Sequence, residues 1–214
     1  SYSLLKGSSD SVRVILGDHD VLDSDDTNII NTTVSKITFP WSYSHFELMD
    51  NIAVLTLSEP VTFNDTIRPV CFPVSHNKFT DDSGVLAGWE NSVNISSTTP
   101  VPNPFFESKL NALDMKVLNE TTCNETISSL VGELQLSGFE PSIDADDFIC
   151  AVEKNTELAT CDVGPGSPLF RADITTAHYL YGVSNPSNSF CGSSVPNVFT
   201  AIKPDDMFLN LALD

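Results

Sequence analysis

Short apolar segments recur along the chain, and clusters of turn-forming residues separate them. The segments have the length of strands, are rich in β-branched residues and are bounded by Gly, Pro, Asn and Asp. They read VRVILG, NIAVLTL, GVLAGW, MKVL, DFICAV, HYLYGV and NVFTAI. This pattern favours an antiparallel all-β barrel or sandwich over an alternation of β and α units.

Two segments carry helix signals. One covers residues 121–134, and the other covers residues 204–213, where Pro204 would occupy the first turn of a final helix. Asp205 and Asp206 would then lie at the positive end of that helix. Residues 91–104, rich in Ser, Thr, Asn and Pro, predict an exposed loop that joins two halves.

The length and hydropathy of the chain are those of a globular protein. It has 214 residues, of which 41% are hydrophobic, enough for one large domain or two packed subdomains. No apolar run approaches the roughly 18 residues needed to span a bilayer. The first residues lack the basic start, apolar run and cleavage site of a signal peptide. We therefore expect either that a leader has been removed or that the chain begins within a longer protein.

The formal net charge is −19. Such a surface repels nucleic-acid phosphates and anionic lipid headgroups, so neither is an expected partner. Two interpretations of the charge stay open: it keeps a secreted protein soluble, or it docks a basic partner.

Cysteines and glycosylation sequons point to a secreted, extracellular protein. The five cysteines form no CxxC pair and the four histidines are scattered, so the sequence predicts no zinc site. An odd number of cysteines in a secreted protein requires a partner outside the chain. Five N-x-S/T sequons add to this picture. They lie at Asn31, Asn64, Asn94, Asn119 and Asn124.

Four blocks of the sequence resemble the trypsin-like serine protease family. Residues 50–73, DNIAVLTLSEPVTFNDTIRPVCFP, are similar to the family's N-D-I-A-L-L-x-L…P-V-x-F…V-R-P-V-C-L-P segment. VILGDHD at 14–20 resembles the strand and loop after the catalytic histidine, and GVLAGW at 84–89 resembles the start of the second barrel. CDVGPGSPLF at 161–170 resembles the C-x-G-D-S-G-G-P-L block around the nucleophile.

The resemblance implies two antiparallel β-barrels and a short C-terminal helix, with the first barrel incomplete at its N-terminus. Residues 1–90 would be the remainder of the first barrel, 91–104 the inter-barrel loop, and 105–214 the second barrel and helix. A barrel that lacks strands would expose apolar edges, so we expect further chain or a partner to fill the gap.

The same resemblance implies a disulfide arrangement. Cys123 would pair with Cys150 to close a helical loop, and Cys161 would pair with Cys191 beside the specificity pocket. Cys71 would then be linked to a cysteine upstream, in a propeptide or regulatory module.

Carried over onto this chain, the family's catalytic positions are degenerate. Pro165 falls at the nucleophilic serine, and Gly164 falls at the aspartate that holds a newly cut N-terminus. Proline also removes one of the two backbone donors of the oxyanion hole. Asn51 falls at the triad aspartate, with Asp50 one place early and expected to point away. Ser167 would be a nucleophile only if the loop had slipped; its structural interpretation is a turn residue.

The family's histidine block, T-A-A-H-C, is not found in the sequence. We interpret the four histidines, at His19, His45, His76 and His178, as surface or satisfied polar residues.

The specificity pocket is altered as well. Ala159 stands where trypsin-like members keep an aspartate that binds basic side chains. Ser184, Asn185 and Pro186 stand where the family has S-W-G, the strand that pairs with substrate backbone, and Pro186 cannot donate a hydrogen bond there.

Five aspartates, Asp18, Asp20, Asp23, Asp25 and Asp26, fall in the loop that binds calcium in some family members. Clustered oxygen ligands suit Ca²⁺, and Asp18 and Asp25 would be the main candidates. The alternative is an ordinary acidic loop, and no other cofactor is expected.

Three functions follow from this interpretation. The first is a secreted, non-catalytic cofactor or regulator that binds a protease, zymogen or substrate of an extracellular cascade. Many non-catalytic arthropod members with an upstream clip domain act in this way in immunity and melanisation, and the G-x-G-S-P-L form here resembles their G-G-S-P-L. The cysteine that often follows that block in them is missing here. The second function is a decoy that competes for a protease's partners or inhibitors, and the third is an unusual serine endopeptidase that uses Ser167.

Overall fold

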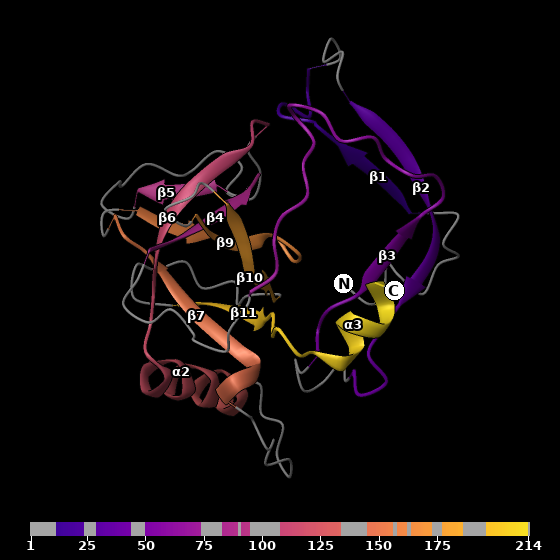
Figure 1. Ribbon diagram of the computed structural model, residues 1–214. Helices are drawn as coiled ribbons and strands as arrows, with labels where there is room; N and C mark the ends of the chain where they lie inside the picture. The colour runs from indigo at the N-terminus through magenta and orange to yellow at the C-terminus, as the bar shows by residue number, and fades with distance from the viewer. Residues whose placement is uncertain are drawn as a thin grey trace.

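Two β-structured halves lie side by side in the chain, with a short final helix beside the first half (Figure 1). This arrangement is seen in a computed structural model, and it confirms the predicted all-β fold class. The structure describes residues 12–23, 29–43, 50–73, 83–89, 91–94, 108–133, 145–155, 158–161, 164–172, 177–185 and 196–213.

The second half is a closed antiparallel barrel with the strand order β10-β11-β7-β6-β4-β9. Its strands are β4 (Ser83–Gly88), β6 (Asn111–Val117), β7 (Phe148–Glu153), β9 (Pro168–Ala172), β10 (His178–Ser184) and β11 (Asn197–Ala201). Strand β4 belongs to this barrel although it precedes residue 90. The strands of the barrel therefore begin before the predicted boundary, because β4 pairs along its whole length with β6.

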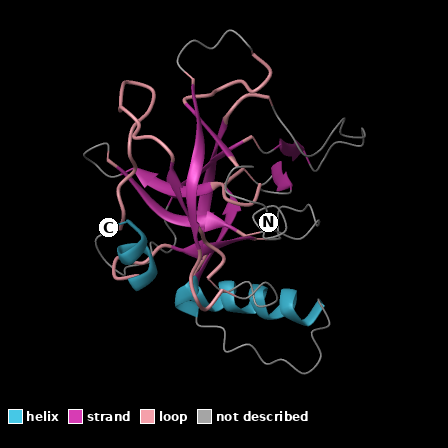
Figure 2. Cartoon of the chain, turned by 90° about the vertical axis from the view of Figure 1, so that its right-hand side faces the viewer, coloured by secondary structure: helices cyan, strands magenta, loops and turns pink. Residues whose placement is uncertain are grey.

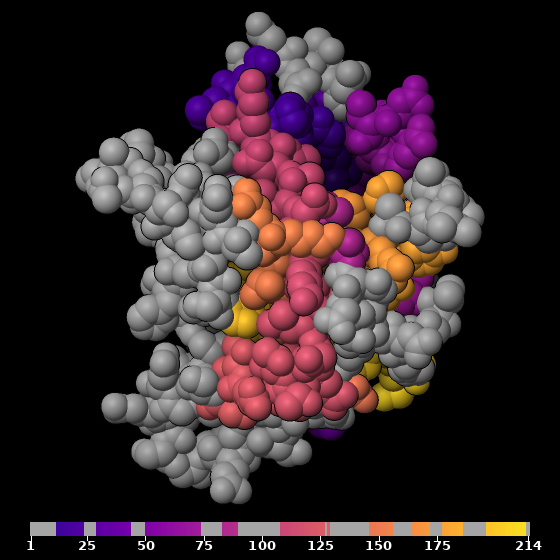
Figure 3. Space-filling model, turned by 90° about the vertical axis from the view of Figure 1, so that its left-hand side faces the viewer, coloured from indigo at the N-terminus to yellow at the C-terminus, as the bar shows by residue number. Residues whose placement is uncertain are grey.

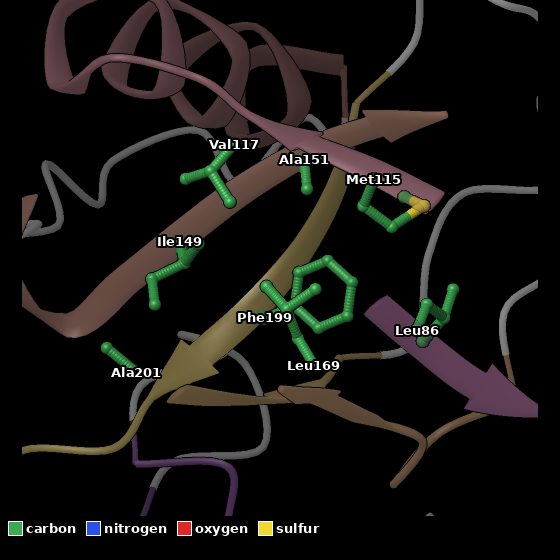
Figure 4. Close-up of a cluster of buried hydrophobic side chains, with 8 residues drawn as sticks. All are labelled: Leu86, Met115, Val117, Ile149, Ala151, Leu169, Phe199 and Ala201. Carbon is green, nitrogen blue, oxygen red and sulfur yellow. The ribbon is translucent and has the colours of Figure 1, made fainter. Parts of the chain in front are cut away.

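The interior of the barrel is apolar. Eight buried side chains form one cluster, and they come from every strand of the barrel except β10. Phe199 of β11 is fully buried near the centre of this cluster (Figure 4). The eight residues are Leu86, Met115, Val117, Ile149, Ala151, Leu169, Phe199 and Ala201. On β10, the Cα of Gly182 lies so close to Phe199 that a built Cβ would be 2.9 Å from the Phe199 Cβ. Alternation of inward and outward residues along each strand explains why short apolar runs suffice to fill this core.

The first half is an open sheet. Its strands β1 (Arg13–Leu16), β2 (Ile30–Thr38) and β3 (Val54–Leu57) pair antiparallel in that order, and in the described residues they do not close into a barrel. Val34 is the buried residue of this sheet, whereas Ile15 is 52% exposed. The difference from the second half follows from strand number, since three strands cannot enclose a core of their own.

A two-stranded sheet adjoins the barrel. It pairs β5 (Asn91–Asn94) with β8 (Leu158–Cys161). The predicted loop over 91–104 therefore begins with a strand, since ladder hydrogen bonds outweigh the turn preference of its Asn and Ser residues. Residues 95–104 lie outside the described part of the chain.

Helix α2 (Glu120–Glu133) confirms the predicted central helix within one residue. Asn119 is its N-cap, since its Oδ1 accepts a hydrogen bond from the backbone N–H of Thr122 at 2.9 Å. A disulfide joins Cys123 of this helix to Cys150 of β7, the pairing that the resemblance implies. Figure 2 shows the helix crossing one end of the strands, and Figure 3 shows that residues 108–133 cover much of one face.

The final helix, α3 (Met207–Leu213), starts three residues later than predicted. Residues 203–206 form a turn instead, and the Oδ1 of Asp206 accepts a hydrogen bond from the N–H of Leu209 at 3.1 Å. Asp206 therefore acts as the N-cap, a position with non-helical backbone angles, which excludes Pro204 from the first turn. The helix packs beside β3 (Figure 1).

Candidate functional site

The segment that the resemblance predicts to stand at the family's nucleophile position, residues 164–167, is a tight turn. The N–H of Ser167 donates to the carbonyl of Gly164 at 3.0 Å, which closes a four-residue turn around Pro165 and Gly166. Gly166 has a φ of 101°, and Pro165 stands at the second position. Proline at the second position and a glycine with positive φ at the third are the sequence requirements of a type II β-turn. The sequence Gly-Pro-Gly-Ser thus specifies this local structure.

Ser184, the last residue of β10, fastens this turn to the barrel. Its Oγ accepts a hydrogen bond from the N–H of Ser167 at 3.0 Å and donates one to the carbonyl of Gly164 at 2.5 Å. Its backbone N–H donates to the carbonyl of Ser167, and its carbonyl accepts from the N–H of Gly166. Ser184 is buried, so these bonds are shielded from water. The turn is therefore held in one conformation from both sides.

Replacing Gly166 by alanine is expected to lower the free energy of unfolding by about 1–2 kcal/mol, because an L side chain disfavours a positive φ. No atom lies within 4 Å of a built Cβ, so the cost is one of backbone conformation and not of a clash. Gly166→Asn should cost less, since asparagine tolerates positive φ better. Urea denaturation of the three proteins measures the difference. Equal stability of Gly166→Ala and the wild type would contradict the turn assignment.

Asn51 and Asn185 meet where the first half joins the barrel. The Nδ2 of Asn51, three residues before β3, donates to the Oδ1 of Asn185 at 2.8 Å. The same Oδ1 accepts from the Oγ1 of Thr200 on β11 at 3.0 Å. Asn185 is 1% exposed, and its Nδ2 has no hydrogen-bond partner in the described part of the chain. A neutral polar network therefore occupies this junction.

The neighbouring Asp50 is directed elsewhere. Its Oδ2 accepts a hydrogen bond from the Oγ of Ser42 at 2.5 Å, and its own φ is 50°. This agrees with the expectation that Asp50 points away from the position that Asn51 occupies.

The two histidines that the structure describes lie on the surface. His19 is exposed in the loop after β1, and its carbonyl accepts from the N–H of Leu110. His178 is exposed at the start of β10, edge-on to the ring of Phe170 at 5.4 Å. At about 3.3 Å per residue, His178 lies roughly 20 Å along the strand from Ser184. His45 and His76 lie outside the described residues.

The predicted pocket residues are already engaged in the fold. The N–H of Asn185 donates to the carbonyl of Val198, and the N–H of Ser184 donates to the carbonyl of Ser167. Ala159 lies in β8, opposite Val93 of β5. Pro186 lies outside the described residues. The sequence did not reveal that Asn185 would contact Asn51, because the two are 134 residues apart and neither pattern nor composition signals the pairing.

Cys71 is exposed and is the free cysteine of the described residues. Its N–H donates to the carbonyl of His178, and its carbonyl accepts from the N–H of Leu180, both at 2.8 Å. The segment that carries it therefore extends the sheet beside β10. Cys191 and the side chain of Cys161 lie outside the described part, so their pairing stays a prediction.

The acidic loop after β1 is described only in part. The Oδ1 of Asp20 accepts from the N–H of Leu22 at 3.3 Å, and its carbonyl accepts from the N–H of Asp23 at 2.8 Å. Asp18 is partly buried, whereas Asp25 and Asp26 lie outside the described residues. Within the described ranges no group of three or more His, Cys, Asp or Glu side chains could hold a metal ion. Calcium binding here stays a prediction.

The sequons that can be placed lie in different settings. Asn31 is exposed on β2, Asn119 caps α2 and Asn124 lies within that helix. The Oδ1 of Asn64 accepts from both the N–H and the Oγ1 of Thr66, which leaves this exposed residue in a side-chain-closed turn. The side chain of Asn94 is outside the described part. Glycosylation of these residues stays a prediction.

The closed barrel, the three-stranded sheet and the short C-terminal helix agree with the serine protease fold that the sequence resemblance implies. The sequence model of the family described as trypsin matches residues 3–209, so the chain belongs to the trypsin family.

The chain is similar in sequence to several known proteins. Clotting factor G beta subunit of Tachypleus tridentatus is 26% identical over 196 residues, covering 90% of this chain and 58% of the relative. Proclotting enzyme of the same species is 24% identical over 201 residues, covering 91% and 48%. Human transmembrane protease serine 11B is 27% identical over 170 residues, covering 79% and 36%. The chain thus spans less than two thirds of each of these proteins. No helix that the structure describes is long and apolar enough to cross a membrane.

Proposed function

We propose that this chain is a non-catalytic member of the trypsin family that acts by binding other proteins. The residue that carries the proposal is Pro165, which the family resemblance places at the nucleophile and which lies in a turn that Ser184 holds by two side-chain hydrogen bonds. A proline side chain has no nucleophilic atom, and its backbone has no N–H for an oxyanion.

The remaining triad positions support the same conclusion. The side-chain amide of Asn51 donates a hydrogen bond to Asn185. In a serine protease triad, replacing the aspartate by asparagine lowers the catalytic rate about 10⁴-fold. Asp50 is bonded to Ser42, so it does not replace the missing carboxylate. The two described histidines are exposed, and His178 lies at the opposite end of β10 from Ser184, which holds the turn.

We assign the binding activity to an extracellular protease cascade, as a cofactor or regulator. Two relatives are named as a clotting factor subunit and a proclotting enzyme. The disulfide between Cys123 and Cys150 and the five sequons suit a secreted protein. A second candidate is a decoy that competes for a protease's partners or inhibitors. The exposed surface of a protease fold without a nucleophile would serve that role as well.

Affinity purification of the tagged full chain from its source fluid separates the two roles. A cofactor is expected to co-purify with a protease or zymogen and with that enzyme's substrate, and to accelerate cleavage of that substrate when added to the purified pair. A decoy would bring down an inhibitor as its sole partner and leave the cleavage rate unchanged.

An unusual endopeptidase that uses Ser167 is the third candidate. The backbone of Ser167 is bonded to both Gly164 and Ser184, and as a turn residue it has the structural role that the sequence predicts. If it were a nucleophile, the purified chain would hydrolyse peptide p-nitroanilides and Ser167→Ala would abolish the reaction.

Cys71 is expected to form a disulfide with an upstream segment or module. Cys71 is exposed, and it is the free cysteine among those whose side chains the structure describes. The mass of the native protein with and without reductant tests this link. Release of a cysteine-bearing fragment on reduction supports it, whereas an unchanged mass in a mature, cleaved protein contradicts it.

A further inference from the structure

We propose that the turn formed by residues 164–167 is a docking element for an arginine side chain of the partner protein. This inference rests on the proposed binding function and names the chemistry of its contact site. In the catalytic form of the fold, this loop offers N–H donors to an oxyanion. Here Pro165 lacks an N–H and the N–H groups of Gly166 and Ser167 are used within the fold.

Every backbone donor from 165 to 167 is absent or used within the fold. Pro165 has no N–H. The N–H of Gly166 donates to the carbonyl of Ser184 at 3.0 Å, and that of Ser167 donates to Gly164 and to the Oγ of Ser184. A substrate carbonyl or an oxyanion would therefore meet no backbone N–H from these three residues.

The acceptors at the tip of the turn are free to take part in binding. Pro165 and Gly166 are both exposed, and their carbonyl oxygens accept no hydrogen bond from the described residues. The space beside the Gly166 Cα is open, since a built Cβ would meet nothing within 4 Å. Two adjacent carbonyls on a turn that is already rigid offer a contact whose ordering cost is low.

A guanidinium group fits this arrangement best. Arginine carries five N–H donors in a planar fork and no acceptor, so it is the side chain best supplied with donors for a contact to carbonyl oxygens. The net charge of −19 draws a basic partner towards the surface, and screening limits that attraction to about 8 Å at physiological salt. The overall charge therefore favours encounter, while the carbonyls of the turn fix the position of the contact.

The test is a titration of the ¹⁵N,¹³C-labelled full chain with N-acetyl-arginine amide, followed by NMR. The carbonyl carbons of Pro165 and Gly166 and the N–H signals of Gly166 and Ser167 should show saturable shifts. N-acetyl-citrulline amide, which keeps the donors without the charge, should bind more weakly, and N-acetyl-norleucine amide should leave these signals unchanged.

A pair of proline variants provides the matched control. Pro165→Ala keeps both carbonyls but frees the backbone of the turn, so binding must order the turn and the arginine compound should bind about 2- to 5-fold more weakly. Pro60→Ala, at another exposed proline, should bind as the wild type does. Unchanged spectra of the barrel residues in both variants confirm that they fold.

Two results would overturn the inference: shifts confined to acidic residues elsewhere, or equal affinity of Pro165→Ala and the wild type. Release of nitroaniline from N-acetyl-arginine p-nitroanilide in the same samples reports separately on the proposed non-catalytic function. Hydrolysis would refute that function whether or not the turn binds arginine.

Discussion

Replacing Phe199 by alanine is expected to lower the free energy of unfolding by about 3–5 kcal/mol. Phe199 is fully buried at the centre of the barrel, where its ring contacts side chains from facing strands (Figure 4). Its removal would leave a cavity that the closed barrel cannot collapse to fill, because the surrounding ladder holds the strands in place.

Phe63→Ala is the matched control for this substitution, because Phe63 is 61% exposed in the loop after β3. Its loss should change the free energy by less than about 1 kcal/mol. If Phe199→Ala does not fold, Phe199→Leu keeps most of the volume and should cost about 1–2 kcal/mol. Urea denaturation compares the four proteins. A cost at Phe199 no larger than at Phe63 would contradict the assignment of the core.

Removal of the disulfide between α2 and β7 should have the second largest effect. In the loop-entropy model, the 27-residue separation of Cys123 and Cys150 corresponds to about 3.5 kcal/mol at 25 °C. The double variant Cys123→Ala, Cys150→Ala is therefore expected to lose about 2–4 kcal/mol. The bond also anchors the helix to the barrel, so α2 should lose protection from hydrogen exchange before the barrel strands do.

Cys71→Ala is the control for that experiment. The exposed Cys71 forms no disulfide with a described residue, so its replacement should change the stability of the chain by less than about 0.5 kcal/mol. A loss in Cys71→Ala as large as in the double variant would show that the stabilising bridge has been misassigned.

Local chemistry made most of the fold predictable from the sequence. The apolar runs from GVLAGW to NVFTAI became β4, β6, β7, β10 and β11, because alternating side chains could line one barrel. At residues 164–167 only Ser167 was predicted to be a turn residue, although proline followed by glycine is the signature of a type II turn. The predicted start of α3 was three residues too early. Asp206 caps the helix, so the helix begins at Met207 and not at Pro204.

Features that depend on contacts between segments far apart in the sequence could not be predicted from the sequence alone. The strand at 91–94 exists because residues 158–161 pair with it, although its own composition indicates a loop. The junction of Asn51, Asn185 and Thr200 unites three separate segments. The family resemblance predicts that Asn51 stands at the triad aspartate, but only the tertiary structure shows that its amide donates to Asn185.

The most direct test of the non-catalytic interpretation is labelling of the purified, mature chain with a fluorophosphonate probe, which reacts with activated serines. Trypsin in a parallel sample should be labelled one to one. Because Pro165 has no hydroxyl and Ser167 is held in the turn, the chain should show no labelling above that of its Ser167→Ala variant. Stoichiometric labelling that Ser167→Ala abolishes would contradict the non-catalytic interpretation and identify Ser167 as an active nucleophile.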